Sequence, residues 1–407
     1  MKYNKIIILY NSRIPSEKAN GYQTFKTAES FILNNKEVEI WGPKRFNLRY
    51  LANRDVKEYY NLLKTPKIIK IFVFDFLTLI KFENSFSKYL KFLSNIILML
   101  TFSIGVLLRI LIKNNKKTIY FTRDVNLAAF LMKLNPSLKN KLFIELHNLP
   151  IKKGRKERQI KILNKSRGIF ALTNYMKKEL SKFNIAERKI LYAPDAVDVS
   201  QFKLKIRKNI ARNSLSLPQK MKIFLYIGKF HTLGNEKGIP EIIKSIKFLN
   251  LKIPYKFYIV GGPLDRVDIY KKIVKKNNID AQKIIFMGRQ EIKKIPIWLK
   301  SADILLMPHP RTEFYEKYVS PLKLFEYMCS NNPIIASNLE SIKEILTNKK
   351  NSLLVDPGSA KSIAEAIETL VNNPKFSKKI AKQAFSDINN FSWIKRGNKI
   401  INFIQNI

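Results

Sequence analysis

The stretch KIFLYIGKFHTLGNEKGIPEIIKSIKFL, residues 222–249, decides the fold. A short apolar run ends at Gly228, a polar loop follows, and the chain then enters the amphipathic pattern of a helix. Strands that alternate with helices form parallel sheets that are covered on both faces. Repetition of this unit along the chain would predict an α/β protein.

The unit is repeated in both halves of the chain. In the first half, short apolar runs predict strands at Ile6–Tyr10, Val38–Trp41, Thr118–Phe121, Leu142–Leu146, Gly168–Leu172 and Ile190–Tyr192. In the second half they predict strands at Ile223–Ile227, Lys256–Val260, Ile284–Met287, Ile304–Met307, Pro333–Ala336 and Ser352–Val355. Two such sets predict two Rossmann-like domains, joined by a linker at Asp198–Lys220, and residues 377–407 look largely helical.

The chain is strongly basic, with 75 Lys and Arg against 31 acidic residues and a formal net charge of +44. Such a charge attracts nucleic acid, phosphorylated substrates or an anionic membrane surface. The lysines are spread along the chain rather than gathered in one arm, so we favour a general background with membrane attraction over nucleic-acid binding. The single cysteine, Cys329, excludes an intrachain disulfide and fits a reducing compartment.

One segment, Phe92–Ile112, is about as long as a membrane span. Lysines flank it, but Asn95, Thr101, Ser103 and Arg109 interrupt it, so three interpretations stay open. In order of preference they are a buried helix, a helix in the membrane interface with lysines against anionic head groups, and a spanning helix. The aromatic-rich run Ile71–Phe82 extends the candidate membrane-contacting segment to 71–112. The apolar run at residues 6–10 is too short for a signal peptide, so we expect a cytoplasmic location.

Candidate chemistry begins at the loop between Lys229 and Lys237. Two ammonium groups at this point can neutralise a diphosphate and stabilise it as a leaving group. Gly228 allows a tight turn, and the helix that follows offers free N–H groups. Two solvated lysines are the plainer alternative in so basic a chain.

Other strand ends also carry glycine, namely Gly262 in FYIVGGP and Gly288, with Arg289, in IIFMGR. Ligands of open α/β sheets bind at such ends. A single glycine would be an ordinary turn, but several in series favour a binding site.

The stretch YVSPLKLFEYMCSNNPIIAS, residues 318–337, predicts a helix with Ser320 as its N-cap. The N–H groups of Leu322 and Lys323 would face a phosphate or a sugar. Glu326 lies among apolar residues in that helix, and its carboxylate can accept hydrogen bonds from both ribose hydroxyls of a nucleotide.

In the first half, Asn20-Gly21 predicts a tight turn before a helix, and ELHNLP places His147 at a strand end. His147 could contact a transferred sugar or be structural. The sequence has no GxGxxG, P-loop or GxSxG motif and no His, Cys and acid cluster with metal-ligand spacing. We expect neither a metal nor a cofactor.

Together the motifs YIGK…EKG, VGGP, MGR, ADILLMP and SPLKLFEYM…NNPIIAS resemble glycosyltransferase family 4, of glycosyltransferase group 1, over nearly the whole second half. The first half resembles it more loosely, at SEKANGYQ, YFTRD, ELHNLP, ALTNYMKKEL and APDAVD. The resemblance implies the GT-B fold, two Rossmann-like domains that face a cleft. We expect an acceptor domain at 1–198, a donor domain at 199–384, and a helix at 385–407 that returns to the first domain.

The resemblance also implies a retaining, metal-independent hexosyltransferase that moves a sugar from a nucleotide-sugar donor to a glycan or lipid-linked acceptor, in surface polysaccharide synthesis. Lys229 and Lys237 would hold the diphosphate, and Glu326 the ribose. The amides of Leu322 and Lys323 would meet the distal phosphate or sugar. The remaining implied contacts are Gly288 and Arg289 near the base, Gly21 in the first-domain loop, and His147 near the primary hydroxyl of the sugar.

Three features depart from the family pattern: Tyr318 stands where a second Glu is common, the 229–237 loop is long, and the first loop has Asn20-Gly21 in place of paired glycines. Three alternatives therefore stay open. They are a nucleic-acid-binding protein, a nucleotide-sugar epimerase of the same fold, and a catalytically silent relative.

Overall fold

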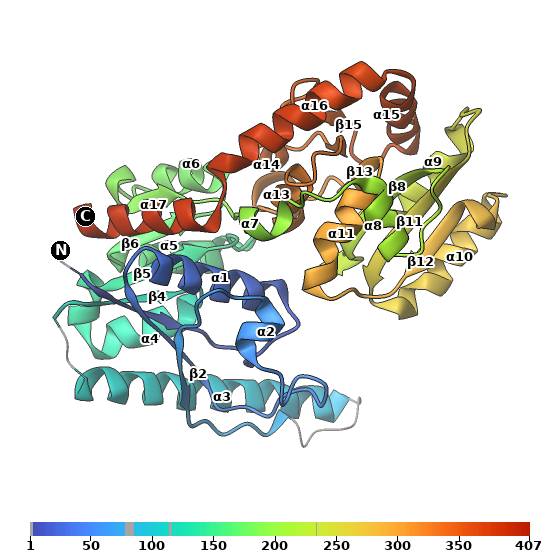
Figure 1. The fold of residues 1–407 in the computed structure, drawn as a ribbon. Helices are drawn as coiled ribbons and strands as arrows, with labels where there is room; N and C mark the ends of the chain where they lie inside the picture. The colour runs from blue at the N-terminus through green and yellow to red at the C-terminus, as the bar shows by residue number, and fades with distance from the viewer. Residues whose placement is uncertain (1–2, 78–84, 114–115, 233) are drawn as a thin grey trace. The chain divides into compact units, whose positions relative to one another are not determined.

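The computed structural model describes residues 3–77, 85–113, 116–232 and 234–407 (Figure 1). The chain forms two compact units. Unit 1 comprises Met1–Pro194 and Trp393–Ile407, and unit 2 comprises Asp195–Ser392. The expected divisions at 198 and 384 differ from these because Val197, Ile388 and Phe391 pack in one hydrophobic cluster of unit 2.

Unit 1 is built on a seven-stranded sheet with the order β3-β2-β1-β4-β5-β6-β7, in which neighbouring strands pair in parallel. The strands are β1 Lys5–Leu9, β2 Glu37–Pro43, β3 Lys67–Ile71, β4 Thr118–Thr122, β5 Leu142–Leu146, β6 Gly168–Ala171 and β7 Ile190–Tyr192. The sequence predicts six of them and misses β3, whose KIIKI pattern places lysines on an edge strand with one neighbour.

Helices cover both faces of this sheet. The longer ones are α1 Ala19–Leu33, α3 Ser85–Ile112, α4 Val125–Leu134, α5 Lys153–Lys165, α6 Asn174–Lys182 and α17 Trp393–Asn406. In Figure 1, α1 and α17 lie above the sheet and pack together, while α3 and α4 lie below it.

Unit 2 repeats this strand order in a six-stranded parallel sheet, β12-β11-β8-β13-β14-β15. The strands are β8 Lys222–Lys229, β11 Tyr255–Gly262, β12 Ile284–Met287, β13 Ile304–Met307, β14 Ile334–Ser337 and β15 Leu353–Val355. Alternate residues of β8 enter two clusters, with Leu225 on one face of the sheet and Phe224 on the other. The two-stranded hairpin of β9 His231–Thr232 and β10 Asn235–Glu236 is not predicted by the sequence.

The helices of unit 2 follow the expected alternation with the strands. They are α9 Ile239–Ser245, α10 Val267–Lys276, α11 Ile295–Ser301, α12 Glu313–Lys317, α13 Leu322–Met328, α14 Glu340–Lys343, α15 Ala360–Asn372 and α16 Pro374–Asp387.

The predicted linker at 198–220 is wrong, since this segment belongs to unit 2. It holds α7 Val199–Phe202 and α8 Lys208–Ser214. From α8, the buried Arg212 donates 3.0 Å bonds to the carbonyls of Ser301 and Met221, and it pairs with Asp303 at 2.6 Å. The polar composition of residues 198–220 suggested an exposed linker. In the structure, however, the basic side chain of Arg212 is buried because it donates to buried acceptors.

Helix α3 has two different faces. Its buried residues recur about once per turn and pack on unit 1: Ser87, Ser94, Leu98, Phe102, Ser103, Val106 and Ile110. The other face exposes large apolar side chains: Phe86, Tyr89, Phe92, Ile97, Leu100, Ile104, Leu108, Leu111 and Ile112. Phe86–Ile112 is long and apolar enough to cross a membrane, with a mean hydropathy of 2.2, and 28% of its most apolar window is buried.

The packing of α17 on α1 gives a stability prediction. A Cβ at Gly397 would lie 2.4 Å from Ser30 Oγ and 3.1 Å from Ser30 C, so Gly397→Ala must push the helices apart. We expect a net loss of about 1–2 kcal/mol, because overpacking outweighs the gain in helix propensity. Urea unfolding measures it. Gly154→Ala in α5, where no atom lies within 4 Å, is the control and should be neutral or stabilising; equal effects of both changes would contradict the packing argument.

Candidate functional site

The candidate site in unit 2 lies at the carboxyl ends of β8 and β13, the point where strand order reverses and where open α/β sheets bind ligands. Close backbone approach shapes it. Gly238 has a φ of +83°, and a Cβ there would lie 1.7 Å from the carbonyl oxygen of Pro308, just past β13. Only glycine allows the β10–α9 loop to lie this close to β13.

Both predicted lysines lie beside this point. Lys229 ends β8 and is exposed, and the hydroxyl of Tyr226 donates a 2.6 Å bond to its carbonyl. Lys237 is half-buried. Burial, and then the nearby charge of Lys229, lower the pKa of Lys237 to about 8, while Glu236 opposes the shift. The loop therefore concentrates positive charge where β8 ends.

The expected free N–H groups at the start of α9 are already used. The Glu236 carboxylate accepts from the N–H groups of Gly238 and Ile239, and from the Tyr270 hydroxyl at 3.1 Å. Burial raises the pKa of Glu236. The prediction of an open helix terminus here is wrong because a side chain of the loop itself caps the helix.

The SPLKLFEYM segment also differs in detail from its prediction. Helix α13 begins at Leu322 with Pro321 as its N-cap, so Ser320 is not the cap. The Ser320 hydroxyl instead accepts a 2.8 Å bond from the N–H of Asp195. Glu326 is half-buried as the fifth residue of α13; burial raises its pKa to about 7, and Lys323 opposes this shift.

The side chains of Lys323 and His309 complete the site. The sequence predicts a site contact only for the amide of Lys323 and no role for His309. The Lys323 side chain is buried and lies under the end of β8, with Nζ 3.8 Å from the centroid of the Tyr226 ring. His309, two residues past β13, is also buried and stacks on Tyr315 at 4.6 Å between ring centroids. The only feature of the sequence that could have pointed to His309 as a site residue is its position just after a predicted strand.

Several polar atoms of this cluster are buried and have no hydrogen-bond partner among the described residues. They are Lys323 Nζ, both ring nitrogens of His309 and the Tyr315 hydroxyl. Unpartnered buried polar atoms are costly, and native structures keep few of them. Their concentration at the strand-order reversal marks a site that is built for a polar or anionic ligand.

The other predicted donor-site residues lie at neighbouring strand ends. Gly262 ends β11, the neighbour of β8, and Gly288 and Arg289 follow β12. Leu322 opens α13. The described residues contain no group of three or more His, Cys, Asp or Glu placed to hold a metal ion.

Unit 1 holds the other two predicted residues. Gly21 and Asn20 lie within the first turn of α1, so the predicted turn is wrong. A Cβ at Gly21 would lie 2.4 Å from the Tyr60 hydroxyl, which accepts from the Ser16 N–H and donates to the Ser16 carbonyl. Gly21 thus serves close packing of α1.

His147 follows β5 and belongs to a charged network. Arg123 donates to Nδ1 at 2.9 Å, which leaves Nε2–H to donate to Glu145 at 2.8 Å. Burial, and then Arg123, lower the pKa of His147 to about 4, so the ring is neutral at pH 7. Both nitrogens are engaged here, and the expected sugar contact of His147 stays a prediction.

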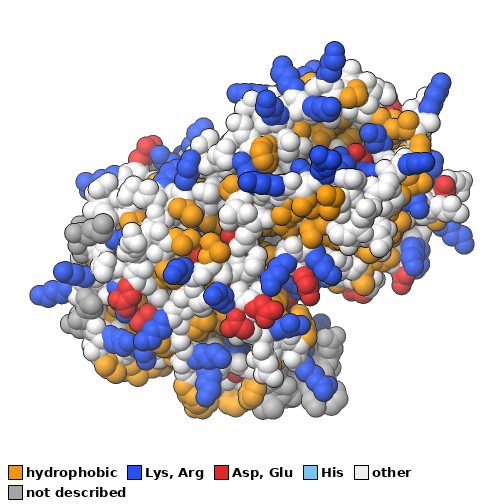
Figure 2. All heavy atoms as spheres, viewed as in Figure 1, with side chains coloured by type: hydrophobic (Ala, Val, Ile, Leu, Met, Phe, Trp, Pro, Cys, Tyr) orange, Lys and Arg blue, Asp and Glu red, His pale blue; other side chains and the backbone are white. Residues whose placement is uncertain are grey.

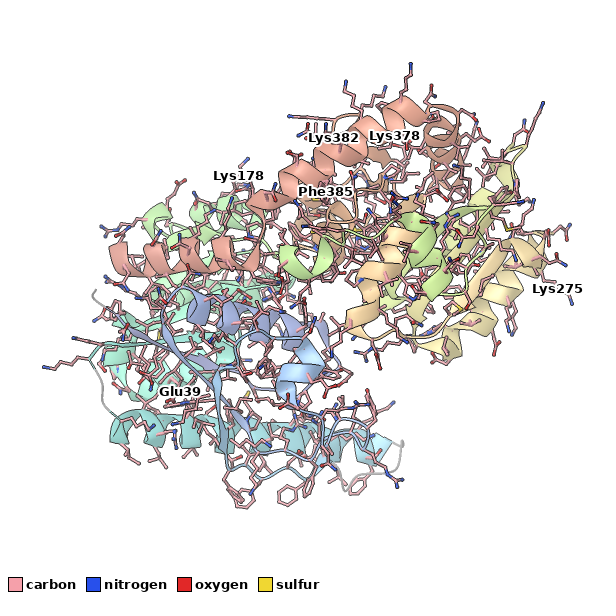
Figure 3. The ribbon with its side chains drawn as sticks, in the orientation of Figure 1. Glu39, Lys178, Lys275, Lys378, Lys382 and Phe385 are labelled. Atoms are coloured by element: carbon pink, nitrogen blue, oxygen red, sulfur yellow. The ribbon has the colours of Figure 1, made fainter. Side chains whose placement is uncertain are left out.

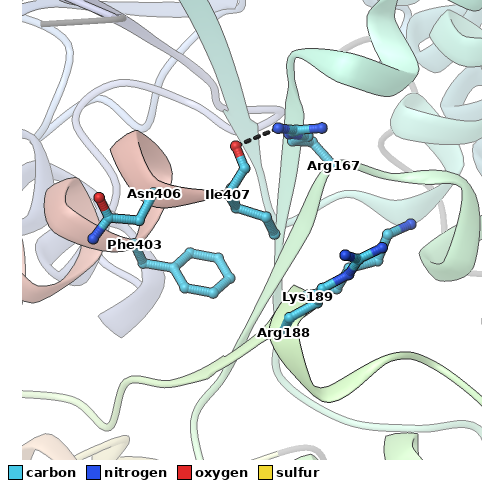
Figure 4. A pocket seen from close by; sticks show the side chains of 6 residues that line it. All are labelled: Arg167, Arg188, Lys189, Phe403, Asn406 and Ile407. Atoms are coloured by element: carbon cyan, nitrogen blue, oxygen red, sulfur yellow. Dashed lines mark hydrogen bonds between the residues drawn. The ribbon is translucent and has the colours of Figure 1, made fainter.

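A basic pocket of about 320 Å³ lies elsewhere in unit 1 (Figure 4). Arg167, which donates to the Ile407 carbonyl, precedes β6, and Arg188 and Lys189 precede β7. This is the amino-end edge of the sheet, opposite the edge where such sheets bind ligands.

Comparison with known proteins connects the unit 2 site with a family. Residues 207–387 match the family described as "Glycosyl transferases group 1". This segment is similar to group 1 glycosyltransferases along most of unit 2. The match covers β8, β13 and α13, so the cluster around Lys237, Lys323 and Glu326 lies within the matched segment.

Individual relatives are distant. An uncharacterised glycosyltransferase of Methanocaldococcus jannaschii is 22% identical over 239 residues, 58% of each chain. A putative teichuronic acid biosynthesis glycosyltransferase of Bacillus subtilis, TuaH, is 25% identical over 47% of this chain and 45% of its own length. The chain spans about half the length of the curated relatives it matches.

The fold agrees along the whole chain. The structure of Anabaena HepE in complex with UDP-glucose superposes with a TM-score of 0.70 at 12% identity, over 99% of this chain and 100% of that one. The two Rossmann-like units therefore agree with the GT-B fold predicted from the sequence.

The raised pKa of Glu326 predicts a pH effect on stability. In the unfolded chain its carboxyl ionises near pH 4.5, but in the folded chain near 7, so stability falls as pH rises across this window and then levels off. Glu326→Gln removes that loss. We expect the variant to gain about 1–3 kcal/mol over the wild type between pH 5 and 8, measured by urea unfolding.

Glu365→Gln, at an exposed position of α15, controls for the loss of one acidic charge. If the difference in free energy of unfolding between Glu326→Gln and wild type stayed the same from pH 5 to pH 8, the raised pKa of Glu326 would be contradicted.

Proposed function

We propose that the protein is a retaining, metal-independent glycosyltransferase that moves a sugar from a nucleotide-sugar donor to a hydroxyl acceptor. The supporting observation is the cluster of buried, unpartnered polar atoms beside two lysines at the strand-order reversal of unit 2, within the segment that matches the group 1 family. HepE, which shares the fold, was solved with UDP-glucose. A nucleotide-sugar is anionic at its diphosphate and rich in hydroxyls elsewhere, which suits such a cluster.

In this proposal each residue has a separate task. Lys229 and Lys237 stabilise the negative charge that develops on the leaving diphosphate. Glu326 accepts hydrogen bonds from the ribose hydroxyls, while Gly288 and Arg289 lie near the base. The bond between the anomeric carbon and the phosphate oxygen breaks as the acceptor oxygen attacks from the same face. The acceptor proton passes to the departing phosphate oxygen, so no protein nucleophile is required.

Removing one lysine tests the function. We expect Lys237→Ala to lower turnover at least about 100-fold while the unfolding midpoint stays near that of the wild type, because charge stabilisation acts mainly in the transition state. Purified protein is assayed for sugar release from UDP-, GDP- and ADP-sugars and for thermal stabilisation by each nucleotide.

Lys244→Ala, at an exposed position of α9, is the matched control. Full activity of Lys237→Ala would refute the assignment of that lysine. Oligonucleotide binding without any nucleotide-sugar binding would favour a nucleic-acid-binding protein instead.

The acceptor side of the proposal involves a membrane. A cytoplasmic enzyme of surface polysaccharide or lipid-linked glycan synthesis meets its acceptor at the inner face of the plasma membrane, and TuaH is named for teichuronic acid biosynthesis. Unit 1 has a surface that suits this location, the exposed apolar face of α3. Figure 2 shows hydrophobic side chains along the lower edge of the view, over α3.

The surface extends beyond α3. The rings of Phe72, Phe74 and Phe76 are exposed: Phe74 stacks on Phe76 and meets Phe72 edge to face. The N–H of Phe74 donates to Thr101 Oγ1 of α3 at 3.3 Å. Exposed lysines at both ends of α3 add charge that attracts anionic lipid: Lys88, Lys113, Lys116 and Lys117. Because the opposite face of α3 packs on unit 1, we infer that the helix lies in the membrane interface rather than across the bilayer.

Vesicle binding tests this surface. We expect wild type to co-sediment with phosphatidylglycerol vesicles and to dissociate as salt rises, since part of the attraction is electrostatic. Leu100→Glu combined with Ile104→Glu should weaken binding at least about tenfold, since two charges would enter the apolar layer. Ile210→Glu, at an exposed apolar position of unit 2, is the control. Unchanged binding of the double variant would contradict the proposal.

A further inference from the structure

The side chain of Lys323 is buried without the hydrogen-bond partners that a lysine with a purely structural role would have among the described residues. It is the second residue of α13, and only 8% of the residue is exposed. Its ammonium has no hydrogen-bond partner among the described residues. Contact with the Tyr226 ring offsets part of the cost of burying the charge, but such contacts are worth less than full hydration.

The ammonium also lies directly under the end of β8. Gly228 has a φ of +142°, and a Cβ built there would be 3.0 Å from Lys323 Nζ. Any larger residue at Gly228 would cover this nitrogen. The glycine therefore lets the backbone at the end of β8 lie directly over the ammonium, next to Lys229, the last residue of β8.

The groups that face Lys323 come from several elements of unit 2. Lys237 and Glu236 lie in the loop before α9, His309 follows β13, and Glu326 lies one turn further along α13. Burial, and then the charge of Lys237, hold the pKa of Lys323 well below its usual range, while Glu326 and Glu236 oppose the shift. Burial, and then Lys323, likewise hold the pKa of His309 well below its usual range. Burial therefore disfavours the charged forms of Lys323 and His309.

We infer that the side chain of Lys323 is a third cation of the donor site and binds the diphosphate of the nucleotide-sugar from beneath Gly228. The inference rests on the proposed function and deepens it. An anion beside the ammonium favours its charged form, so binding takes up a proton from solvent. Lys229 and Lys237 alone match the two negative charges of a diphosphate ester, and Lys323 supplies a third positive charge to match the one that the leaving group gains.

A ligand-binding role and a structural role of Lys323 predict opposite results for Lys323→Met. Methionine matches the length of the lysine stem without its charge, so the unliganded variant should unfold at a higher temperature than the wild type. The same variant should bind the nucleoside diphosphate at least about tenfold more weakly, as expected for a lost charge-assisted hydrogen bond. A lysine that served only stability would show the reverse pattern.

The experiment is calorimetric titration of the full chain with UDP, GDP and ADP, in two buffers with different ionisation enthalpies at pH 7.5. We expect wild type to bind one of them with net proton uptake, and Lys323→Met to bind it weakly with less uptake. Lys323→Gln, which keeps a hydrogen-bond donor but no charge, should also lose uptake. Lys275→Met, on the exposed side of α10 (Figure 3), should match the wild type.

Two outcomes overturn the inference in distinguishable ways. Wild-type protein that binds none of the three nucleotides would refute the proposed function and this inference with it. Wild-type protein that binds a nucleotide, together with Lys323→Met and Lys323→Gln variants that bind it equally well with equal proton uptake, would refute the role of Lys323 alone.

Discussion

The structure of unit 1 depends on one buried carboxylate. Glu145, at the carboxyl end of β5, is 2% exposed and pairs with Arg396 of α17 at 2.6 Å. It also accepts from His147 and Gln23, which brings β5, α1 and the end of the chain to one point. Burial alone would raise its pKa, but the charge of Arg396 and the bond from His147 lower the pKa well below its usual range. Loss of one partner from such a buried pair typically costs about 3–5 kcal/mol, so the carboxylate fixes α17 to the sheet.

Much of the fold follows from local pattern, because a parallel strand buried on both faces must be apolar throughout. That requirement identified β8, β11 and β13 and, through their order, the edge where the site lies. It missed β3, since an edge strand can carry lysines, and it misread α8, whose Arg212 is buried by hydrogen bonds rather than by apolar character.

The site was only partly predictable for a related reason. Residue type and spacing selected Lys237 and Glu326, which the structure brings to one edge. The partner of each polar group, however, depends on contacts across the sheet that no local pattern contains. Glu236 caps α9, the Ser320 hydroxyl accepts from the Asp195 N–H, and the Lys323 side chain lies buried against the Tyr226 ring. Unsatisfied buried groups become visible only once the surrounding chain is in place.

The division of the chain has a consequence for synthesis on the ribosome. Unit 2, Asp195–Ser392, is inserted in sequence between the two pieces of unit 1. The sheet of unit 1 therefore emerges before unit 2 but waits for α17, which follows unit 2 in the sequence, before Glu145 meets Arg396. During that interval a buried carboxylate and the face of α1 lack their partner, and unit 2 has time to fold on its own. Termination of translation after unit 2 but before α17 would thus damage the unit made first and spare the one made second.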